Sequence, residues 1–396
     1  MNFLLKAFPP ENYRLLEPLA FKTRSFLLVA ALSTSVCFPS PAFALQSFII
    51  DLNTREATDL GSLGGGDIEA LGINVAGQVV GYSRTATGAY HAFITGPDGA
   101  GMADLGTLGG ESSFATDINA AGQVVGYSVT TEGNTHAFIT GPSGVGMTDL
   151  GSLGGENAKA DGINDAGRVI GRSQTAGGAY HAFITAPNGV GMTDLGTLGG
   201  ESSEAYDIND AGQVVGSSVT TEGNTHAFIT GPNGVGMADL RTLGENFSVA
   251  YGINNAGQVV GVNGAFHAFI TGPNGVGMTD LGTLGGGASA ASELNDAGQV
   301  VGNSHFTGGG GTPHAFIASS NGADMIDLNS LVDLPTGIFF VNGQDINNLG
   351  QVAGVGVIPE PEVYAMFLAG LGLMAAMSRR SNYPEMIAAQ LSYSKP

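Results

Sequence analysis

Six histidines stand at matching positions along this chain, and an aspartate follows each of them thirteen residues later. The pairs are His91 and Asp104, His136 and Asp149, His181 and Asp194, His226 and Asp239, His267 and Asp280, and His314 and Asp327. Imidazole and carboxylate groups are common metal ligands, so the pattern first suggests a metal site. However, the histidines fall on the third strand expected in each repeat, away from any axis on which equivalent residues could converge. We therefore expect them to pack or to form hydrogen bonds, and we predict no metal site.

Asparagines after Ile or Leu also recur seven times, and the aspartate of each Asp-Leu pair usually precedes a Gly. Such rings of short polar side chains resemble ligand sets, but beside Gly turns they commonly bond to their own backbone. The stretch 207–212 approximates a calcium-binding loop, yet Ala211 occupies a ligand position and the distant Glu of such loops is absent. We predict no cofactor, and calcium is the one cation that these loops could attract.

The chain has no Gly-x-Ser-x-Gly elbow, and no single His is set apart beside a nucleophile. Hydrolysis or cleavage of a glycan by paired carboxylates stays open, because acids are plentiful and propellers can host such sites. A catalytic site needs local differences between repeats, and the pronounced irregularities are confined to 305–313 and 329–340. We predict a non-catalytic binding or structural protein; the alternative is a carbohydrate-active propeller enzyme.

The elements that would position these residues follow from one unit repeated seven times. Its turn asparagines are Asn74, Asn119, Asn164, Asn209, Asn254, Asn295 and Asn347. In the unit 194–240, strands are expected at 204–209, 213–217, 226–230 and 237–240, separated by Gly-containing turns. Four antiparallel strands per unit of about 45 residues are typical of a β-propeller blade. We predict an all-β, seven-bladed β-propeller.

The ends of the array predict how the ring closes. Residues 47–50 and 57–61 supply a third and a fourth strand, while 345–347 and 350–354 supply a first and a second. Together they complete a seventh blade and remove the open edges that an unclosed array would leave. The alternative is a β-solenoid, which would have atypical capping repeats instead of complementary halves.

Charge excludes one class of partner. Between 45 and 358 the chain has six Lys or Arg against 29 Asp or Glu, a formal charge of −23. Because phosphate binding needs basic surface, we expect no nucleic-acid partner.

Binding is expected on the face that carries the loops between the second and third strands and between blades, since the length changes fall there. Aromatic rings on this face could contact sugars or apolar partners, and carboxylates could accept hydrogen bonds or bind a cation. The competing interpretation is that the Tyr side chains cover blade edges. The candidate binding residues are Tyr82, Tyr90, Tyr127, Tyr180, Phe266, Glu111, Glu132, Glu156, Glu201 and Glu222.

The first 44 residues are typical of a signal peptide with an extended n-region. Lys22 and Arg24 precede an apolar run at 26–36, and Ala42 and Ala44 are the small residues of the expected small-x-small cleavage site. The single cysteine, Cys37, falls inside this segment, so we expect no disulfide in the mature chain.

Residues 358–380 resemble the PEP-CTERM sorting signal of Gram-negative bacteria. Pro359, Glu360 and Pro361 precede an uncharged run at 363–377, which Arg379 and Arg380 follow. The resemblance implies a transmembrane helix that retains the precursor at the inner membrane, followed by processing by an exosortase. Such signals usually end at the Arg cluster, whereas a tail at 381–396 follows here.

Residues 47–357 resemble the HAF repeat of extracellular bacterial proteins, through His-Ala-Phe followed by Gly and Asp-Leu. The resemblance implies an exported repeat protein and transfers no active site. We therefore expect a propeller at 45–357 that reaches the cell surface or extracellular matrix and has polysaccharide or envelope proteins as partners.

Overall fold

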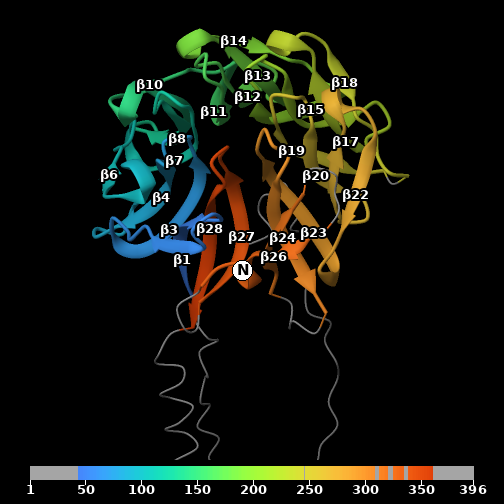
Figure 1. Cartoon of the computed structure of the whole chain (residues 1–396). Helices are drawn as coiled ribbons and strands as arrows, with labels where there is room; N and C mark the ends of the chain where they lie inside the picture. Colours follow the sequence, from blue (N-terminus) through green and yellow to red (C-terminus); the bar gives the residue numbers. More distant parts are fainter. Residues whose placement is uncertain (1–42, 245, 308–311, 320–323, 334–337, 360–396) are drawn as a thin grey trace, which may run out of the picture. The chain divides into compact units, whose positions relative to one another are not determined.

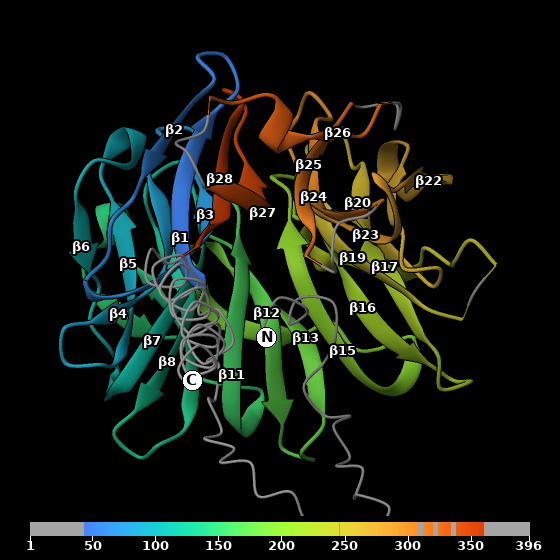
Figure 2. The same cartoon turned by 90° about the horizontal axis from the view of Figure 1, so that it is seen from below.

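The computed structural model describes residues 43–244, 246–307, 312–319, 324–333 and 338–359. They form seven four-stranded antiparallel sheets, which follow one another around a central axis in sequence order (Figures 1 and 2). The predicted seven-bladed, all-β propeller is confirmed.

Blades 1 to 6 are built from four consecutive strands each. The strands of blades 1 to 3 are β3 (Gly64–Ile73), β4 (Val79–Thr85), β5 (Tyr90–Thr95) and β6 (Met102–Asp104); β7 (Gly109–Ile118), β8 (Val124–Thr130), β9 (Thr135–Thr140) and β10 (Met147–Asp149); and β11 (Gly154–Ile163), β12 (Val169–Thr175), β13 (Tyr180–Ala186) and β14 (Val190–Asp194). Those of blades 4 to 6 are β15 (Gly199–Ile208), β16 (Val214–Thr220), β17 (Thr225–Thr230) and β18 (Met237–Asp239); β19 (Ser248–Ile253), β20 (Val259–Asn263), β21 (Ala268–Thr271) and β22 (Met278–Gly282); and β23 (Gly285–Leu294), β24 (Val300–Phe306), β25 (His314–Ala318) and β26 (Ile326–Asp327).

Blade 7 joins the two ends of the array. Its strand order is β2 (Glu56–Asp59), β1 (Phe43–Asp51), β28 (Gln351–Pro359) and β27 (Phe339–Ile346), so two strands come from each end (Figure 2). The predicted clasp is confirmed, and the solenoid alternative is wrong because a closed ring leaves no terminal repeat to cap.

The hydrophobic core lies between the blades. Each of the seven junctions holds a cluster of buried apolar side chains. The Phe of His-Ala-Phe is fully buried in every blade that has the motif. Phe93 of blade 1, for example, packs against Ile49 and Ala353 of blade 7. Burial of a Phe contributes about 1.5–3 kcal/mol, so the repeated motif stabilises each junction.

A β-bulge on the first strand of each blade explains a second repeated residue. In blade 1, Ala70 pairs with Gly81 and Gly72 pairs with Val80, which leaves Leu71 as the extra residue. A side chain at Gly81 would collide with the backbone oxygen of Glu69. Glycine is therefore required opposite the bulge.

The seven turn asparagines form a closed ring, which we call the asparagine ring. Asn74 Oδ1 accepts hydrogen bonds from the backbone N–H groups of Ala76 and Gln78, both at 3.0 Å. Its Nδ2 donates to the carbonyl oxygen of Asn119 in the next blade at 3.1 Å. The series ends where Asn347 donates to Asn74 at 3.0 Å. As predicted, these side chains bond to backbone, and in addition they connect neighbouring blades.

The repeated histidines hold the outer strands together. In all six pairs the His Nδ1 lies 2.6–2.9 Å from a carboxylate oxygen of the Asp thirteen residues later. The other Asp oxygen commonly accepts from the backbone two residues on, as in Asp104 and Gly106 at 2.7 Å. The predicted hydrogen bonding is confirmed.

Most of the predicted targeting residues lie outside the described residues. Ala42, Glu360, Pro361, Arg379, Arg380 and the run 363–377 are among them, whereas Ala44 lies in β1 and Pro359 ends β28. Within the described ranges, no helix is long and apolar enough to cross a membrane.

Candidate functional site

The two ends of the propeller carry different connections. Gly99, between the third and fourth strands, donates to the oxygen of Gly77, between the first and second, at 3.1 Å. These turns therefore share one end, which we call the turn face. The start of β3, at Gly64, pairs instead with the end of β4, at Thr85. Blade-to-blade loops and second-to-third loops thus share the other end, the loop face, as predicted.

The predicted aromatic residues do not form one exposed surface. Tyr82 and Tyr127 are partly buried; the Tyr82 hydroxyl donates to the Glu69 carboxylate, and Phe114 lies between the two Tyr rings. Burial raises the pKa of Tyr127 to about 12. Tyr90 joins this cluster at its edge and donates to Asp67 at 3.2 Å.

The other two aromatic candidates lie apart from this cluster. Tyr180 is partly buried beside the Arg172 guanidinium, and Phe266 is 47 % exposed near Phe247. The structure therefore brings three of the five aromatic candidates together and separates the other two.

The five predicted glutamates are all exposed on the loop face, but they come from blades 2, 3 and 4 only, with two each from blades 2 and 4 and one from blade 3. Glu111, Glu156 and Glu201 lie near the start of first strands, and Glu132 and Glu222 lie in second-to-third loops. Thr131 donates to Glu132 at 2.8 Å, and this hydrogen bond lowers the pKa of the Glu132 carboxyl. The five glutamates therefore lie along the rim of three consecutive blades and are not gathered in one pocket.

Blade-specific side chains lie toward the loop face on the first and second strands. The position four residues before the Ile or Leu of the turn holds Glu69, Phe114, Lys159, Glu204, Val249, Ala290 and Asn342. Lys159 stands over the Tyr127 ring at 4.1 Å, while Arg172 pairs with Glu204. Enclosure by protein and the nearby Arg172 charge lower the pKa of the Lys159 ammonium. In this half of the propeller, the side chains at equivalent positions therefore differ from blade to blade in size and in charge.

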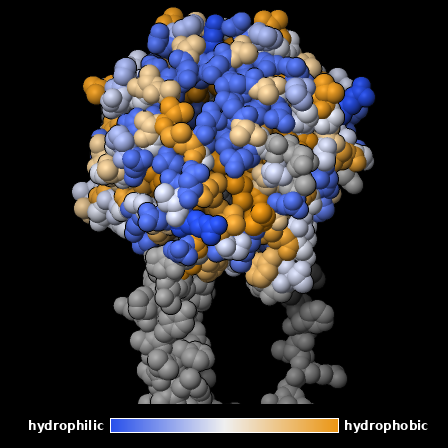
Figure 3. Space-filling view, viewed as in Figure 1, coloured by the Kyte–Doolittle hydropathy of each residue, from blue (hydrophilic) through white to orange (hydrophobic). Residues whose placement is uncertain are grey.

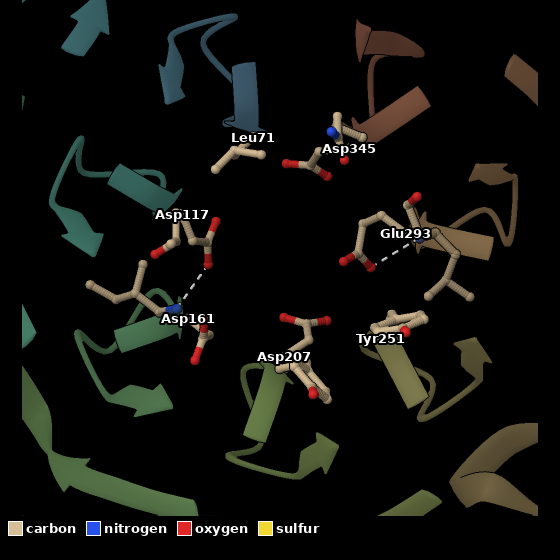
Figure 4. A pocket seen from close by; sticks show the side chains of 13 residues that line it. Leu71, Asp117, Asp161, Asp207, Tyr251, Glu293 and Asp345 are labelled. Atoms are coloured by element: carbon tan, nitrogen blue, oxygen red, sulfur yellow. Dashed lines mark hydrogen bonds between the residues drawn. The ribbon is translucent and has the colours of Figure 1, made fainter. Parts of the chain in front are cut away.

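A cavity of about 240 Å³ lies in the central channel, next to the asparagine ring. In Figure 4, carboxylates from blades 2, 4, 6 and 7 point toward its centre. The lining residues are Leu71, Thr116, Asp117, Asp161, Ile163, Tyr206, Asp207, Tyr251, Ser292, Glu293, Leu294, Gln344 and Asp345. The outer surface in Figure 3 mixes hydrophilic and hydrophobic residues, whereas this cavity is mostly polar.

Acid and glycine alternate around the channel at the residue before each turn Ile or Leu. The series from blade 1 to blade 7 is Gly72, Asp117, Gly162, Asp207, Gly252, Glu293 and Asp345. We call its four acids the carboxylate ring. Asp117 accepts from the backbone N–H of Ile118 at 2.7 Å and from that of Ile163, in the next blade, at 2.8 Å.

Asp207 and Asp345 bridge blades in the same way. Asp207 accepts from Ile208 and Ile253, and Asp345 from Ile346 and Ile73, all at 2.6–2.7 Å. Each bridge ends on a blade whose own residue is Gly.

Seven is odd, so a strict alternation must fail once, and it does so between blades 6 and 7. There the longer Glu293 accepts from the backbone N–H of its own neighbour Leu294 at 2.9 Å. Its carboxylate turns back against Gly252, where an added side chain would overlap it.

The pKa of Asp117 is shifted by its burial and by the other acids of the carboxylate ring. The surrounding protein removes most of the water from this carboxyl, and the charges of Asp345 and Asp207 add repulsion. Both effects raise the pKa of Asp117 well above its usual range, against the two backbone hydrogen bonds that favour the charged form. The Asp117 carboxyl therefore binds a proton more tightly than an exposed aspartate does.

The carboxylate ring was not predicted from the sequence. The signal was present, because alignment of the seven repeats shows Asp, Glu or Gly at the position just before the nearly constant Ile-Asn pair. This signal was missed because strict alternation along a strand places successive residues on opposite faces of the sheet. The bulge lets two successive residues, such as Tyr206 and Asp207, both line the channel, whereas strict alternation would place one of them elsewhere.

No family model matches the chain, and no characterised protein matches it in sequence. Similar solved structures include a putative TolB from Agrobacterium tumefaciens, with 12% identity, a TM-score of 0.48, and coverage of 81% of this chain and 100% of that one. TolB from Acinetobacter baumannii has 14% identity and a TM-score of 0.44, over 62% of this chain and 61% of that one.

A structure from a study of two prolyl endopeptidases has 12% identity and a TM-score of 0.49, over 69% of this chain and 44% of that one. These likenesses carry no argument about the function of this chain.

Proposed function

We propose that the chain is an exported, envelope- or matrix-associated binding protein without catalytic activity, which presents its loop face to glycan or protein partners. One observation supports this proposal. The turn face repeats the same Asn turn in every blade, whereas the loop-facing half carries blade-specific side chains such as Phe114, Lys159 and Glu204. A partner that binds in one orientation needs differences between blades, and rigid strands that end in variable loops commonly provide them.

The proposal includes the targeting segments read from the sequence. Residues 1–44 would direct export, and the PEP-CTERM-like segment 358–380 would retain the precursor at the membrane until an exosortase-type enzyme processes it. The HAF-like repeat is the sequence feature in favour of an extracellular location. The high acidic charge between 45 and 358 favours solubility outside the cell and disfavours nucleic acid.

Replacement of two aromatic side chains of the loop face by alanine tests the proposal. The double variant Tyr90→Ala and Tyr180→Ala removes two partly exposed rings near strand starts. Its matched control shortens the Pro-Asn-Gly turns at 187–189 and 232–234 on the turn face. We expect the Tyr variant alone to lose retention of envelope extract or polysaccharide in a pull-down, at an unchanged melting temperature. Equal retention by both variants would remove the loop-face assignment.

A carbohydrate-active enzyme was the alternative, and its distinguishing feature was an acid pair within 305–313 or 329–340. Those segments contain one acid between them, the exposed Asp333. Asp117 has the raised pKa expected of a general acid, but both its oxygens accept backbone hydrogen bonds. We therefore favour the binding function.

A further inference from the structure

The central channel combines enclosure with acidic walls along its length. Five of its thirteen lining residues carry carboxylates, and none of these described residues is Lys, Arg or His. The turn-face mouth adds Asp165, Asp210 and Asp296 to the lining. Low-dielectric walls that carry charge of one sign concentrate the opposite charge between them. The channel therefore attracts cations from its turn-face end.

A second observation comes from a neutral side chain in the same wall. Gln344 lines the cavity and is 5 % exposed. Its Nε2 donates to Glu69 at 3.1 Å, but its Oε1 accepts no hydrogen bond. A buried acceptor left without a donor costs about 1–3 kcal/mol. A ligand that brings N–H donors into the channel would offset that cost.

Geometry decides which kind of cation fits. Among the described residues, no three His, Cys, Asp or Glu side chains are close enough together to hold one metal ion. Asp117, Asp207 and Asp345 are also fixed by backbone bonds at opposite sides of the ring and cannot converge easily (Figure 4). An ammonium group suits such a site better, since one or two hydrogen-bond acceptors are enough to hold it and its carbon stem fills the remaining space.

We propose that the central channel binds an aliphatic ammonium group, with the carboxylate ring and Gln344 as acceptors. The group could belong to a free polyamine or to a lysine side chain of a partner protein, because the recognition chemistry is shared. This site is separate from the loop-face aromatics and does not depend on the function proposed for them. Bound cation would also relieve the repulsion among Asp117, Asp207 and Asp345.

Calorimetric titration of the purified full chain with spermidine, at constant ionic strength, tests the proposal. We expect saturable binding at one site. Glu293→Gln keeps an oxygen for Leu294 and removes one charge, so it should weaken binding at least about tenfold. Gln344→Met should weaken it about threefold to tenfold by removing the buried acceptor. Glu56→Gln is the matched control; it removes one exposed charge outside both sites and should change affinity less than about twofold.

Several results would overturn the proposal. Spermidine heats that match those of sodium chloride, or equal weakening by Glu293→Gln and Glu56→Gln, would mean general charge screening. Tighter binding of calcium, lost in Glu293→Gln, would mean a metal site.

Comparison of ligands identifies the source of the amine. Nα-acetyl-lysine-N-methylamide keeps the ammonium group of a lysine side chain. Binding of this compound as tight as that of spermidine would indicate a partner lysine, whereas much weaker binding would indicate a polyamine. Loss of retention in the Tyr90 and Tyr180 variant with unchanged spermidine affinity would keep the two sites distinct.

Discussion

The seven residues of the asparagine ring lie in the turns that follow the first strands, and the four of the carboxylate ring lie two residues earlier in their blades, yet the two rings obey different rules. The asparagine ring is complete, and each Asn bonds to its own turn and to the next blade. The carboxylate ring skips three blades with Gly and changes from Asp to Glu at Glu293. A ring that satisfies its hydrogen bonds by repetition is structural, whereas a ring that departs from the repeat in an enclosed, charged channel marks a binding site.

Opening the propeller should have the largest effect, because both rings need closure. Deletion of 45–61 removes all of β2 and most of β1, including Phe48 and Ile50, which are buried in the blade 6–7 core. We expect loss of cooperative urea unfolding, since the exposed edge and lost core exceed a typical stability of about 5–15 kcal/mol. Deletion of 381–396 is the control, and cooperative unfolding of both variants would refute the clasp as the closing element.

Single substitutions in the two rings should lower the free energy of unfolding by different amounts, and the larger of these losses should be smaller than the effect of opening the propeller. Asn209→Ala removes an acceptor for Gln213 N–H at 3.0 Å and a donor to Asn254 oxygen at 3.1 Å. We expect a loss of about 2–4 kcal/mol in the free energy of unfolding, measured in urea. Glu293→Gln, which keeps its backbone acceptor, should lose less than about 1 kcal/mol. Similar losses in both variants would show that the carboxylate ring is as structural as the asparagine ring.

A pH series should reveal the smallest effect, from Asp117 alone. The folded-state pKa of Asp117 is raised, so the folded chain binds this proton more tightly than the unfolded chain does. Its contribution to stability is therefore fully present below the unfolded pKa, near 4, and is lost as pH rises through the folded pKa. We expect wild type to gain stability over Asp117→Asn as pH falls within that window, by at most about 1.4 kcal/mol per pH unit. A difference in unfolding free energy that stays constant with pH would contradict this assignment.

The repeat predicted most of the fold because each blade is built from local signals. Gly turns set the hairpins, the Phe of His-Ala-Phe supplies the core, and the thirteen-residue spacing brings His91 to Asp104 across adjacent strands. The clasp was predictable too, since two incomplete halves add to one blade. By contrast, the Tyr candidates were chosen by strand position, and packing between blades encloses Tyr82 and Tyr127.

The sequence by itself therefore determined seven blades, their strand order, their closure and the acidic charge of the chain. The tertiary structure alone decided that Asp117, Asp207, Glu293 and Asp345, far apart in the chain, surround one cavity with Gln344. The physical reason is that rotation about the propeller axis brings one residue per blade to a common centre. In addition, the β-bulge turns two successive residues toward that centre, which strand periodicity does not reveal.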